Sequence, residues 1–205
     1  MVRQSCLSDR TVSVIADTSV VINLNATQCA EAILEALPNP FLVVSEVVPE
    51  LESGLQSGRN DVAALEAWIT SGRVRIEQLG YAGVQHFSNL VSGPAAQTLD
   101  DGEAATIALA LEIKPHAIPL IDERKANRIC SDRFAHLVTG SSVDLLTQDD
   151  VQVALGNAPL ADAVFNALLV GRMRVLPHHL DWVVYLIGPE RARQCESLPR
   201  SVRSG

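Results

Sequence analysis

The chain has 205 residues, of which 47% are hydrophobic and 20% charged, so it can bury a core as one domain or as one domain with an appendage. Its formal net charge of −8 excludes binding of nucleic acid through a broad basic surface, because phosphate neutralisation dominates that kind of affinity. The apolar runs are far shorter than the roughly 18 residues of a membrane span, and residues 1–10 lack the apolar stretch of a signal peptide. We therefore expect a soluble, cytoplasmic protein with no membrane partner.

The first predicted strand covers residues 12–16, a short run of apolar and β-branched side chains that ends in Asp17. Such a run is typical of a strand covered on both faces in a parallel sheet. Asp17, Thr18 and Ser19 then offer side chains that can cap a helix. The next predicted helix covers residues 26–37, before two prolines.

Residues 41–44 form a second candidate strand or an extended connector. Ser45 is expected to cap the following helix, which carries Glu46 and Glu50 one turn apart on the same face. The elements predicted next are a helix at 61–71, a strand at 74–76 and a helix at 81–91.

The clearest predicted helix covers residues 99–111, with an aspartate cap, an alanine-rich body and Glu103 in its first turn. A second buried strand at 117–121 ends in Asp122. The elements expected after it are a helix at 124–130, a short third core strand at 136–138 and a helix that opens at 140–142. This alternation predicts an α/β fold with a parallel sheet and helices on both faces.

The pattern after residue 149 is helical, with predicted helices at 160–170 and 178–187. Residues 1–149 carry 10 basic and 19 acidic side chains, a net charge of −9, whereas residues 150–205 carry 6 and 5, a net charge of +1. We therefore divide the chain into an α/β domain, 1–149, and a helical C-terminal extension, 150–205. The extension is expected to pack on the domain or at an interface.

The cysteines and histidines indicate neither a disulfide framework nor a zinc site. No two cysteines form a CxxC pair, and the histidines have no HxH or HExxH spacing. We expect free thiols, and we expect the His178–His179 pair to cap a helix or lie on the surface.

Acidic side chains instead define the candidate site. Because the carboxyl ends of parallel strands share one edge of the sheet, Asp17 and Asp122 are expected to meet there, and a helix N-terminus brings Glu103 to the same edge. Close carboxylates repel one another unless a cation neutralises them, and Mg²⁺ or Mn²⁺ is the cation that oxygen ligands prefer. Each acid alone also fits a simpler role, as a helix cap or, for Glu50, as a solvent-facing side chain.

Four segments, in order, resemble the acidic motifs of the PIN-domain family, most closely a bacterial branch related to toxins of type II toxin–antitoxin systems. The resemblance covers about residues 12–148. Its segments lie at residues 14–19, 45–51, 99–110 and 119–126. It implies a PIN-like three-layer α/β/α fold with a central parallel sheet.

The resemblance also implies a metal-dependent ribonuclease that hydrolyses RNA phosphodiester bonds. Its catalytic and metal-binding residues would be Asp17, Glu50, Glu103 and Asp122, holding one or two Mg²⁺ or Mn²⁺ ions. The implied partners are the RNA substrate, a second copy of the chain in a homodimer and an antitoxin protein. The rival interpretations are a catalytically idle PIN-like scaffold that binds RNA or a protein, and a phosphatase or nucleotide-binding domain.

Two further groups of side chains are candidates for binding the substrate. Thr18 and Ser19 carry hydroxyls that can orient a substrate phosphate, although local capping explains them too. Arg124, Lys125 and Arg128 follow Asp122 on one predicted helix and can guide phosphates, although a solvated helix face explains them equally well.

Overall fold

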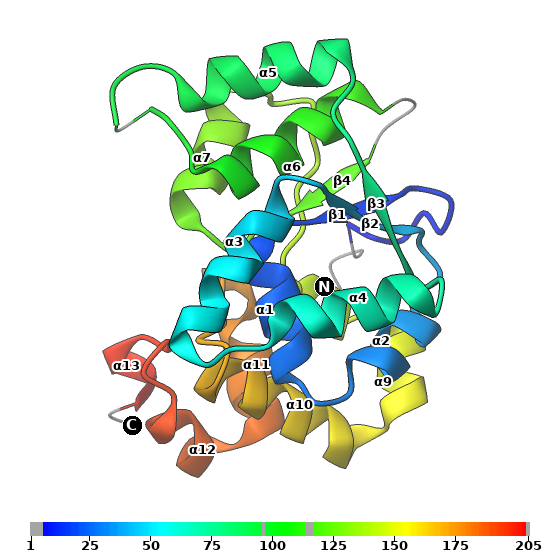
Figure 1. The fold of residues 1–205 in the computed structure, drawn as a ribbon. Helices are drawn as coiled ribbons and strands as arrows, with labels where there is room; N and C mark the ends of the chain where they lie inside the picture. The colour runs from blue at the N-terminus through cyan, green and yellow to red at the C-terminus, as the bar shows by residue number, and fades with distance from the viewer. Residues whose placement is uncertain (1–5, 96, 114–116, 204–205) are drawn as a thin grey trace.

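The computed structural model of the chain describes residues 6–95, 97–113 and 117–203; the start of the 1–10 segment lies outside these ranges. A four-stranded, all-parallel sheet with the order β3-β2-β1-β4 forms its centre (Figure 1). The strands are β1 (Val14–Ala16), β2 (Phe41–Val44), β3 (Val74–Glu77) and β4 (Ile118–Leu120). In register, Ala16 lies opposite Val43 of β2 and Leu120 of β4.

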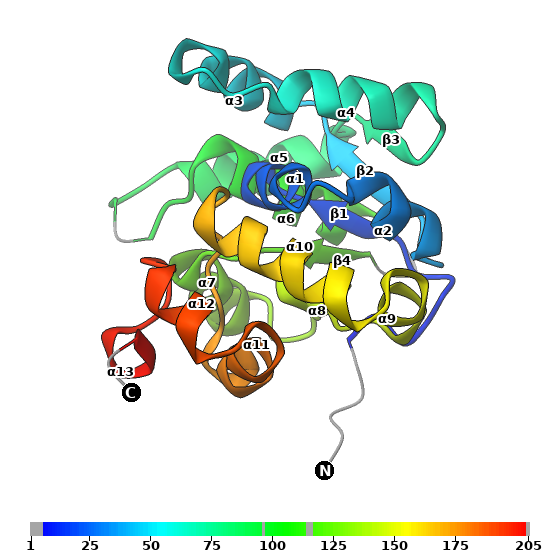
Figure 2. The ribbon, with the colours of Figure 1, turned by 90° about the horizontal axis from the view of Figure 1, so that it is seen from below.

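Helices cover both faces of this sheet, which confirms the predicted three-layer α/β/α fold (Figures 1 and 2). In order, the helices before β4 are α1 (Thr18–Ala26), α2 (Ala30–Ala36), α3 (Val47–Ser53), η1 (Gly54–Ser57), α4 (Asp61–Thr70), α5 (Tyr81–Val91) and α6 (Asp101–Glu112). Those after β4 are α7 (Arg124–Arg133), α8 (Ser142–Leu146), α9 (Asp149–Leu155), α10 (Asn157–Leu169), η2 (Pro177–His179), α11 (Leu180–Ile187), α12 (Pro189–Gln194) and α13 (Arg200–Arg203). Helices α5 and α6 lie on one side of the sheet, and α1, α2 and α4 on the other.

The strand order creates a switch point between β1 and β4. From β1 the chain moves outward to β2 and β3, and it then returns to the other side of β1 to form β4. In open parallel sheets, a crevice at the carboxyl ends of the strands forms where the direction of winding changes. The fold therefore places the residues that follow β1 and β4, the first of which are Asp17 and Ile121, beside this crevice.

The C-terminal helices pack into the same hydrophobic core as the sheet. Helix α10 buries Leu160, Val164 and Leu168 against that core, and α11 adds Val183 and Ile187. Helix α10 contacts α1, and α9 contacts α2, so residues after 149 cover the outer side of the β1-to-β2 crossover (Figure 2). No helix in the described part of the chain is long and apolar enough to cross a membrane.

Most predicted elements are confirmed, but the helix predicted at 26–37 begins later, as α2 at Ala30–Ala36, and a separate helix, α1, precedes it. Asp17 caps α1 directly after β1, and the chain turns at Gln28, whose φ of 61° is left-handed, before α2 begins. Thr27 closes α1 by donating its hydroxyl to the Leu24 carbonyl at 2.5 Å. The β-branched run at the start of α1 hid this helix, because such residues favour strands.

Two smaller expectations are also wrong. Residues 136–138 form a turn and irregular chain, and the sheet is extended by one parallel bridge from Leu120 to Gly140. A Cβ atom on Gly140 would lie 2.9 Å from Leu120 Cδ2, so a larger residue there would have to displace the Leu120 side chain. Ser45 does not cap α3; its hydroxyl donates to the neighbouring Glu46 carboxylate at 3.0 Å.

Candidate metal and nuclease site

Asp17 lies at the carboxyl end of β1 and is 2% exposed. It is the N-cap of α1, and its Oδ1 accepts hydrogen bonds from Val20 N and Ser19 Oγ, both at 2.8 Å. These bonds fix the carboxylate and leave Oδ2 without a partner among the described residues. Helix capping therefore uses one oxygen of this side chain, and a metal role needs the other.

Asp122 follows β4 and is equally buried. Its Oδ1 accepts from Ser142 N at 2.8 Å, and its Oδ2 accepts from Asn23 Nδ2 at 2.7 Å and from Ser142 Oγ at 2.5 Å. Asn23 belongs to α1 and Ser142 to α8, so this carboxylate ties three segments of the fold together. Hydrogen bonds of this kind favour the ionised form of the acid.

Glu103 and Glu50 come from the helices that border the same crevice. Glu103 lies in the first turn of α6, where Asp100 Oδ1 caps the helix by accepting from Glu103 N at 2.9 Å. Glu50 of α3 accepts from Gly102 N at 2.8 Å through Oε1, and from the Thr18 hydroxyl through Oε2. Glu50 is thus held by the residue that follows Asp17 and by the residue that precedes Glu103.

Gly102 makes this approach of α3 to α6 possible. A Cβ atom at residue 102 would lie 2.5 Å from Glu50 Oε2 and 2.7 Å from Thr18 Oγ1, which is closer than real contacts allow. A side chain at residue 102 would displace the Glu50 carboxylate, and this contact, not the backbone angles of residue 102, is the reason for a glycine here. We refer to Asp17, Glu50, Glu103 and Asp122 as the carboxylate cluster.

Burial is the main cause that raises the pKa values of three members of this cluster, and nearby negative charges add to it. Burial, followed by the charge of Asp122, raises the pKa of Asp17 well above its ordinary value. Burial also raises the pKa of Glu103 to about 7, with help from Asp100 and Glu123. The pKa of Asp122 is raised by burial to about 6, against the hydrogen bonds from Ser142 and Asn23.

This arrangement fits a hard divalent cation. Its donor atoms are all carboxylate oxygens, the set that Mg²⁺ and Mn²⁺ prefer, and burial raises the pKa values of Asp17, Glu103 and Asp122, with repulsion from Asp122 and Glu103 adding to the shift of Asp17. The ligand oxygens of the cluster are more widely spaced than a compact site requires, because no three of them form a group within 4.8 Å in the described residues.

Comparison with protein families gives one match, a PIN-domain family model that covers residues 13–180. The chain belongs to the PIN-domain family. PIN domains have a nuclease-type fold and typically use divalent metals, which agrees with the oxygen-only donor set described above. Comparisons with curated proteins and with solved structures found no match.

The PIN-domain match extends well beyond residue 149, the predicted end of the α/β domain. It includes all of α9 and α10 and ends at the first residue of α11. The buried faces of these helices, which contact α1 and α2, are therefore part of the family fold in this chain.

The other candidate binding residues separate in space. The Thr18 and Ser19 hydroxyls both donate to members of the cluster, so in this structure they orient Glu50 and Asp17. Lys125 Nζ donates to the Ala95 carbonyl at 2.8 Å, and Arg128 lines a cavity beside Asn89 and Asp132, away from Asp122. Of the three cations on α7, Arg124 is the one that lines a cavity together with Asp122.

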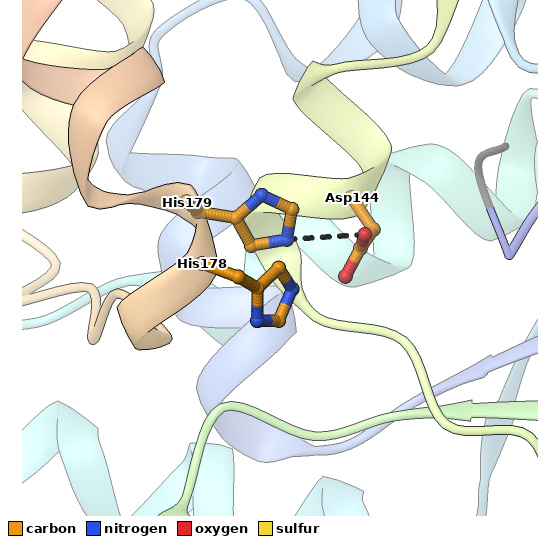
Figure 3. Close-up of side chains that lie close together, drawn as sticks. All are labelled: Asp144, His178 and His179. Atoms are coloured by element: carbon orange, nitrogen blue, oxygen red, sulfur yellow. Dashed lines mark hydrogen bonds and ion pairs between the residues drawn. The ribbon is translucent and has the colours of Figure 1, made fainter. Parts of the chain in front are cut away.

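A second group of potential metal ligands lies outside the cluster (Figure 3). Within the described residues, Asp144, His178 and His179 are the group whose ligand atoms all lie within 4.8 Å of one another. His179 Nε2 lies 3.1 Å from Asp144 Oδ1, and Asp144 Oδ2 accepts from Ser141 N and Ser141 Oγ at 2.9 and 2.6 Å. Burial acts to raise the pKa of Asp144, but the bonds from His179 and Ser141 hold it below its ordinary value.

Sequence reasoning missed the side chains that hold Asp122, Asn23 and Ser142. One signal for Asn23 was present, since an asparagine within the apolar run of residues 20–24 is unusual unless a buried partner satisfies it. Ser142 had no comparable signal, because Ser141 and Ser142 are equally good caps by sequence. In the structure Ser141 caps α8, and Ser142 binds Asp122.

Proposed function

We propose that this PIN domain is a divalent-metal-dependent endoribonuclease that hydrolyses RNA phosphodiester bonds at the carboxylate cluster. The observation that carries the proposal is the convergence of buried acids at the switch point, with the pKa values of Asp17, Glu103 and Asp122 all raised. Such an arrangement costs stability unless a cation or a proton neutralises it. Structural acids are usually paired with basic side chains instead.

The four acids would hold Mg²⁺ or Mn²⁺ through carboxylate oxygens. When bound, the metal would lower the pKa of a water nucleophile and stabilise charge on the phosphate oxygens. The surrounding residues fix the ligands: Asn23 and Ser142 orient Asp122, whereas Thr18 and Gly102 orient Glu50. No side chain is required to form a covalent bond with the substrate, because water is the nucleophile.

Cleavage of a single-stranded RNA with internal fluorophore and quencher tests the proposal. The full chain should cleave it in Mg²⁺ or Mn²⁺ and should stop in EDTA, and Asp17→Asn should be inactive under both conditions. If the folded parent leaves RNA intact in both metals while still binding it, the catalytically idle scaffold is the correct interpretation. If the Asp17→Asn variant cuts as fast as the parent, the activity belongs to another site or a contaminant.

We also propose that the chain acts with protein partners, as a homodimer and as the toxin of a toxin–antitoxin pair. The support is the sequence resemblance to the toxin-related branch. Light scattering of the purified chain tests the homodimer. Co-expression with an adjacent gene for a small DNA-binding protein tests the pair. If expression of this chain alone inhibits growth and co-expression relieves the inhibition, the pair is supported. If expression of this chain alone leaves growth unaltered, the toxin role is contradicted.

A further inference from the structure

A cavity of about 600 Å³ lies beside the carboxylate cluster, between the end of β4 and the C-terminal helices. Asp122 and Arg124 form one wall. The other lining residues lie between Leu168 and Pro199 and include Arg172 and Arg174. The cavity therefore joins the predicted catalytic acid to the part of the chain after residue 149.

Buried neighbours anchor the segment that carries Arg172 and Arg174, and both arginines line the cavity. From Arg172 to Val175 the residues alternate between exposed and buried, with Met173 1% and Val175 5% exposed. Met173 N also bonds to the Ala167 carbonyl at 3.0 Å, which ties the segment to the end of α10. Arg172 has a left-handed φ of 56°, and both Arg172 and Arg174 are exposed and line the cavity, whereas Met173 and Val175 are buried.

The loop before this segment is held tightly against α1. A Cβ atom on Gly171 would lie 2.7 Å from Asn23 Oδ1 and 2.8 Å from the Ala167 carbonyl. Asn23 is the residue that donates to Asp122. The loop that presents the arginines is thus packed on the same asparagine that orients the acid.

Two of the three arginines have no partner to neutralise them. Arg124 and Arg172 make no ion pair or hydrogen bond with the described residues, whereas Arg174 Nη1 lies 2.6 Å from Glu123 Oε2. One acid other than Asp122, Glu196, also lines the cavity. In a chain with a net charge of −8, free guanidinium groups beside a carboxylate cluster indicate a local attraction for anions.

We propose that this cavity binds the phosphate backbone of the RNA strand next to the bond that is cut. This inference rests on the proposed ribonuclease function and deepens it. A guanidinium group matches a phosphate in charge and can donate two parallel hydrogen bonds to it. The cavity has no aromatic lining residue in the described part of the chain, so it offers no platform for base stacking.

The test measures binding separately from cleavage. It uses the full chain carrying Asp17→Asn, which is expected not to cut RNA. Binding of a fluorescein-labelled oligouridylate is followed by anisotropy in EDTA at several salt concentrations. Arg124→Ala and Arg172→Ala should each weaken binding by about three- to tenfold. Each should also make the slope of log affinity against log salt concentration shallower, by about 0.7 for every phosphate that is no longer neutralised. Circular dichroism and the melting temperature establish that each variant is folded.

Arg73→Ala is the matched control, since it removes one arginine from the opposite edge of the sheet. Arg73 precedes β3 and forms an exposed ion pair with Glu35 at 2.9 Å, so its loss should leave RNA binding unchanged. The proposal would be overturned if Arg124→Ala, Arg172→Ala and Arg73→Ala all bind RNA as tightly as the parent. It would also be overturned if Arg73→Ala weakens binding as much as the other two variants do. Undetectable binding by the Asp17→Asn parent would also overturn it.

Failure of the proposed ribonuclease function would give a different pattern of binding and cleavage results from failure of the cavity proposal. If the chain with all four acids does not cut RNA in Mg²⁺ or Mn²⁺, but Arg124→Ala and Arg172→Ala still weaken binding, the cavity binds RNA in a catalytically idle scaffold. If the chain cuts RNA and both variants cut it with unchanged KM, the ribonuclease stands and the cavity is not part of its substrate path.

Discussion

The two groups of potential metal ligands in this protein differ in how their charges are balanced. In the carboxylate cluster, acids lie near acids, and the pKa values of Asp17, Glu103 and Asp122 are raised. In the group of Asp144, His178 and His179, an acid lies near a base and a capping serine, and the pKa of Asp144 is lowered. The second group is more compact, yet it is already satisfied by its own hydrogen bonds.

This contrast shows that spacing alone is a poor guide to a metal site. The His179–Asp144 contact links the segment before α11 to the start of α8, which also supplies Ser142 to Asp122. It therefore has a structural explanation that needs no ion. In the carboxylate cluster Asp17 and Asp122 also have structural hydrogen bonds, but these do not remove the charge repulsion that Asp122 exerts on Asp17.

The aspartate variants should show the greatest change, which is in cleavage. Asp17→Asn and Asp122→Asn should each lower the rate of RNA cleavage on the order of a thousandfold, since metal ligation contributes several kcal/mol to transition-state stabilisation. The two should differ in stability. Asparagine can still cap α1 at residue 17, whereas at residue 122 its amide group would face the donors of Asn23 and Ser142.

Thermal melting in EDTA checks this difference. The Asp17→Asn variant should melt above the parent, because one charge leaves the cluster and the cap is kept. Asp122→Asn should melt below Asp17→Asn. The reverse order would contradict our description of how Asp122 is held.

The next effect in size is on the pH dependence of stability without metal. The folded-state pKa values of Glu103 and Asp122 are raised to about 7 and 6. The stability that these two acids contribute is therefore present at low pH, where both are protonated, and is lost as the pH rises through 6 and 7. As the pH is lowered from 8 to 5, the free energy of unfolding should rise by about 2–4 kcal/mol. The Asp144 contribution runs in the opposite direction, but it is lost only below about pH 4, outside this window.

Urea denaturation in EDTA at pH 5, 6, 7 and 8 measures this trend. Saturating Mn²⁺ should flatten or invert it, because protons then compete with the metal for the same oxygens. If the free energy of unfolding in EDTA instead decreases as the pH is lowered from 8 to 5, the acids are not mutually repulsive.

A third, smaller effect is expected from Gly102→Ala. The added Cβ atom must displace the Glu50 carboxylate and the Thr18 hydroxyl, while helix α6 itself gains from alanine. Cleavage should fall by about ten- to a hundredfold, as for other changes that misorient a ligand, with little change in melting temperature. Gly54→Ala is the control, since its Cβ would meet Arg59 at an ordinary 3.5 Å.

The double variant Gly102→Ala with Glu50→Ala tests the route by which the glycine acts. If the glycine acts through Glu50, removing Glu50 first should leave little for Gly102→Ala to change. If the losses in cleavage rate caused by Gly102→Ala and Glu50→Ala add fully in the double variant, Gly102 does not act through Glu50.

The least effect on activity is expected from His179→Ala. This change removes the hydrogen bond between His179 and Asp144 Oδ1 and should destabilise the fold by about 1–2 kcal/mol. RNA cleavage at a temperature well below the melting transition should be unchanged. His136→Ala, at an exposed position, should alter stability by less than about 0.5 kcal/mol. A large loss of cleavage by His179→Ala would give the second group a catalytic role.

Local chemistry made much of this fold predictable from the sequence. Asp100 and Asp17 cap α6 and α1 as their side-chain type predicts, and the apolar runs at β1 and β4 are buried on both faces. The order of strands and helices then placed Asp17 and the segment after β4 at one sheet edge. These are consequences of residues close in sequence together with the general handedness of parallel crossovers.

What the sequence could not supply depends on contacts between distant segments. The bond from Asn23 to Asp122 joins residues 99 positions apart, and the contact of Gly102 with Glu50 joins residues 52 apart. Among the arginines after residue 149, Arg191 pairs with Asp162, whereas Arg172 has no ion pair or hydrogen bond with the described residues. Ion pairing is decided by tertiary packing, which no local pattern encodes.

Calorimetric titration of Mn²⁺ at pH 8 into three forms of the full chain distinguishes the two groups of potential metal ligands. The forms are the parent, Asp17→Asn and the double variant His178→Ala with His179→Ala. We predict that the parent and the double histidine variant bind Mn²⁺ equally, and that Asp17→Asn binds at least about tenfold more weakly. Unchanged binding by Asp17→Asn together with loss of binding in the double histidine variant would contradict the assignment of the metal site to the carboxylate cluster.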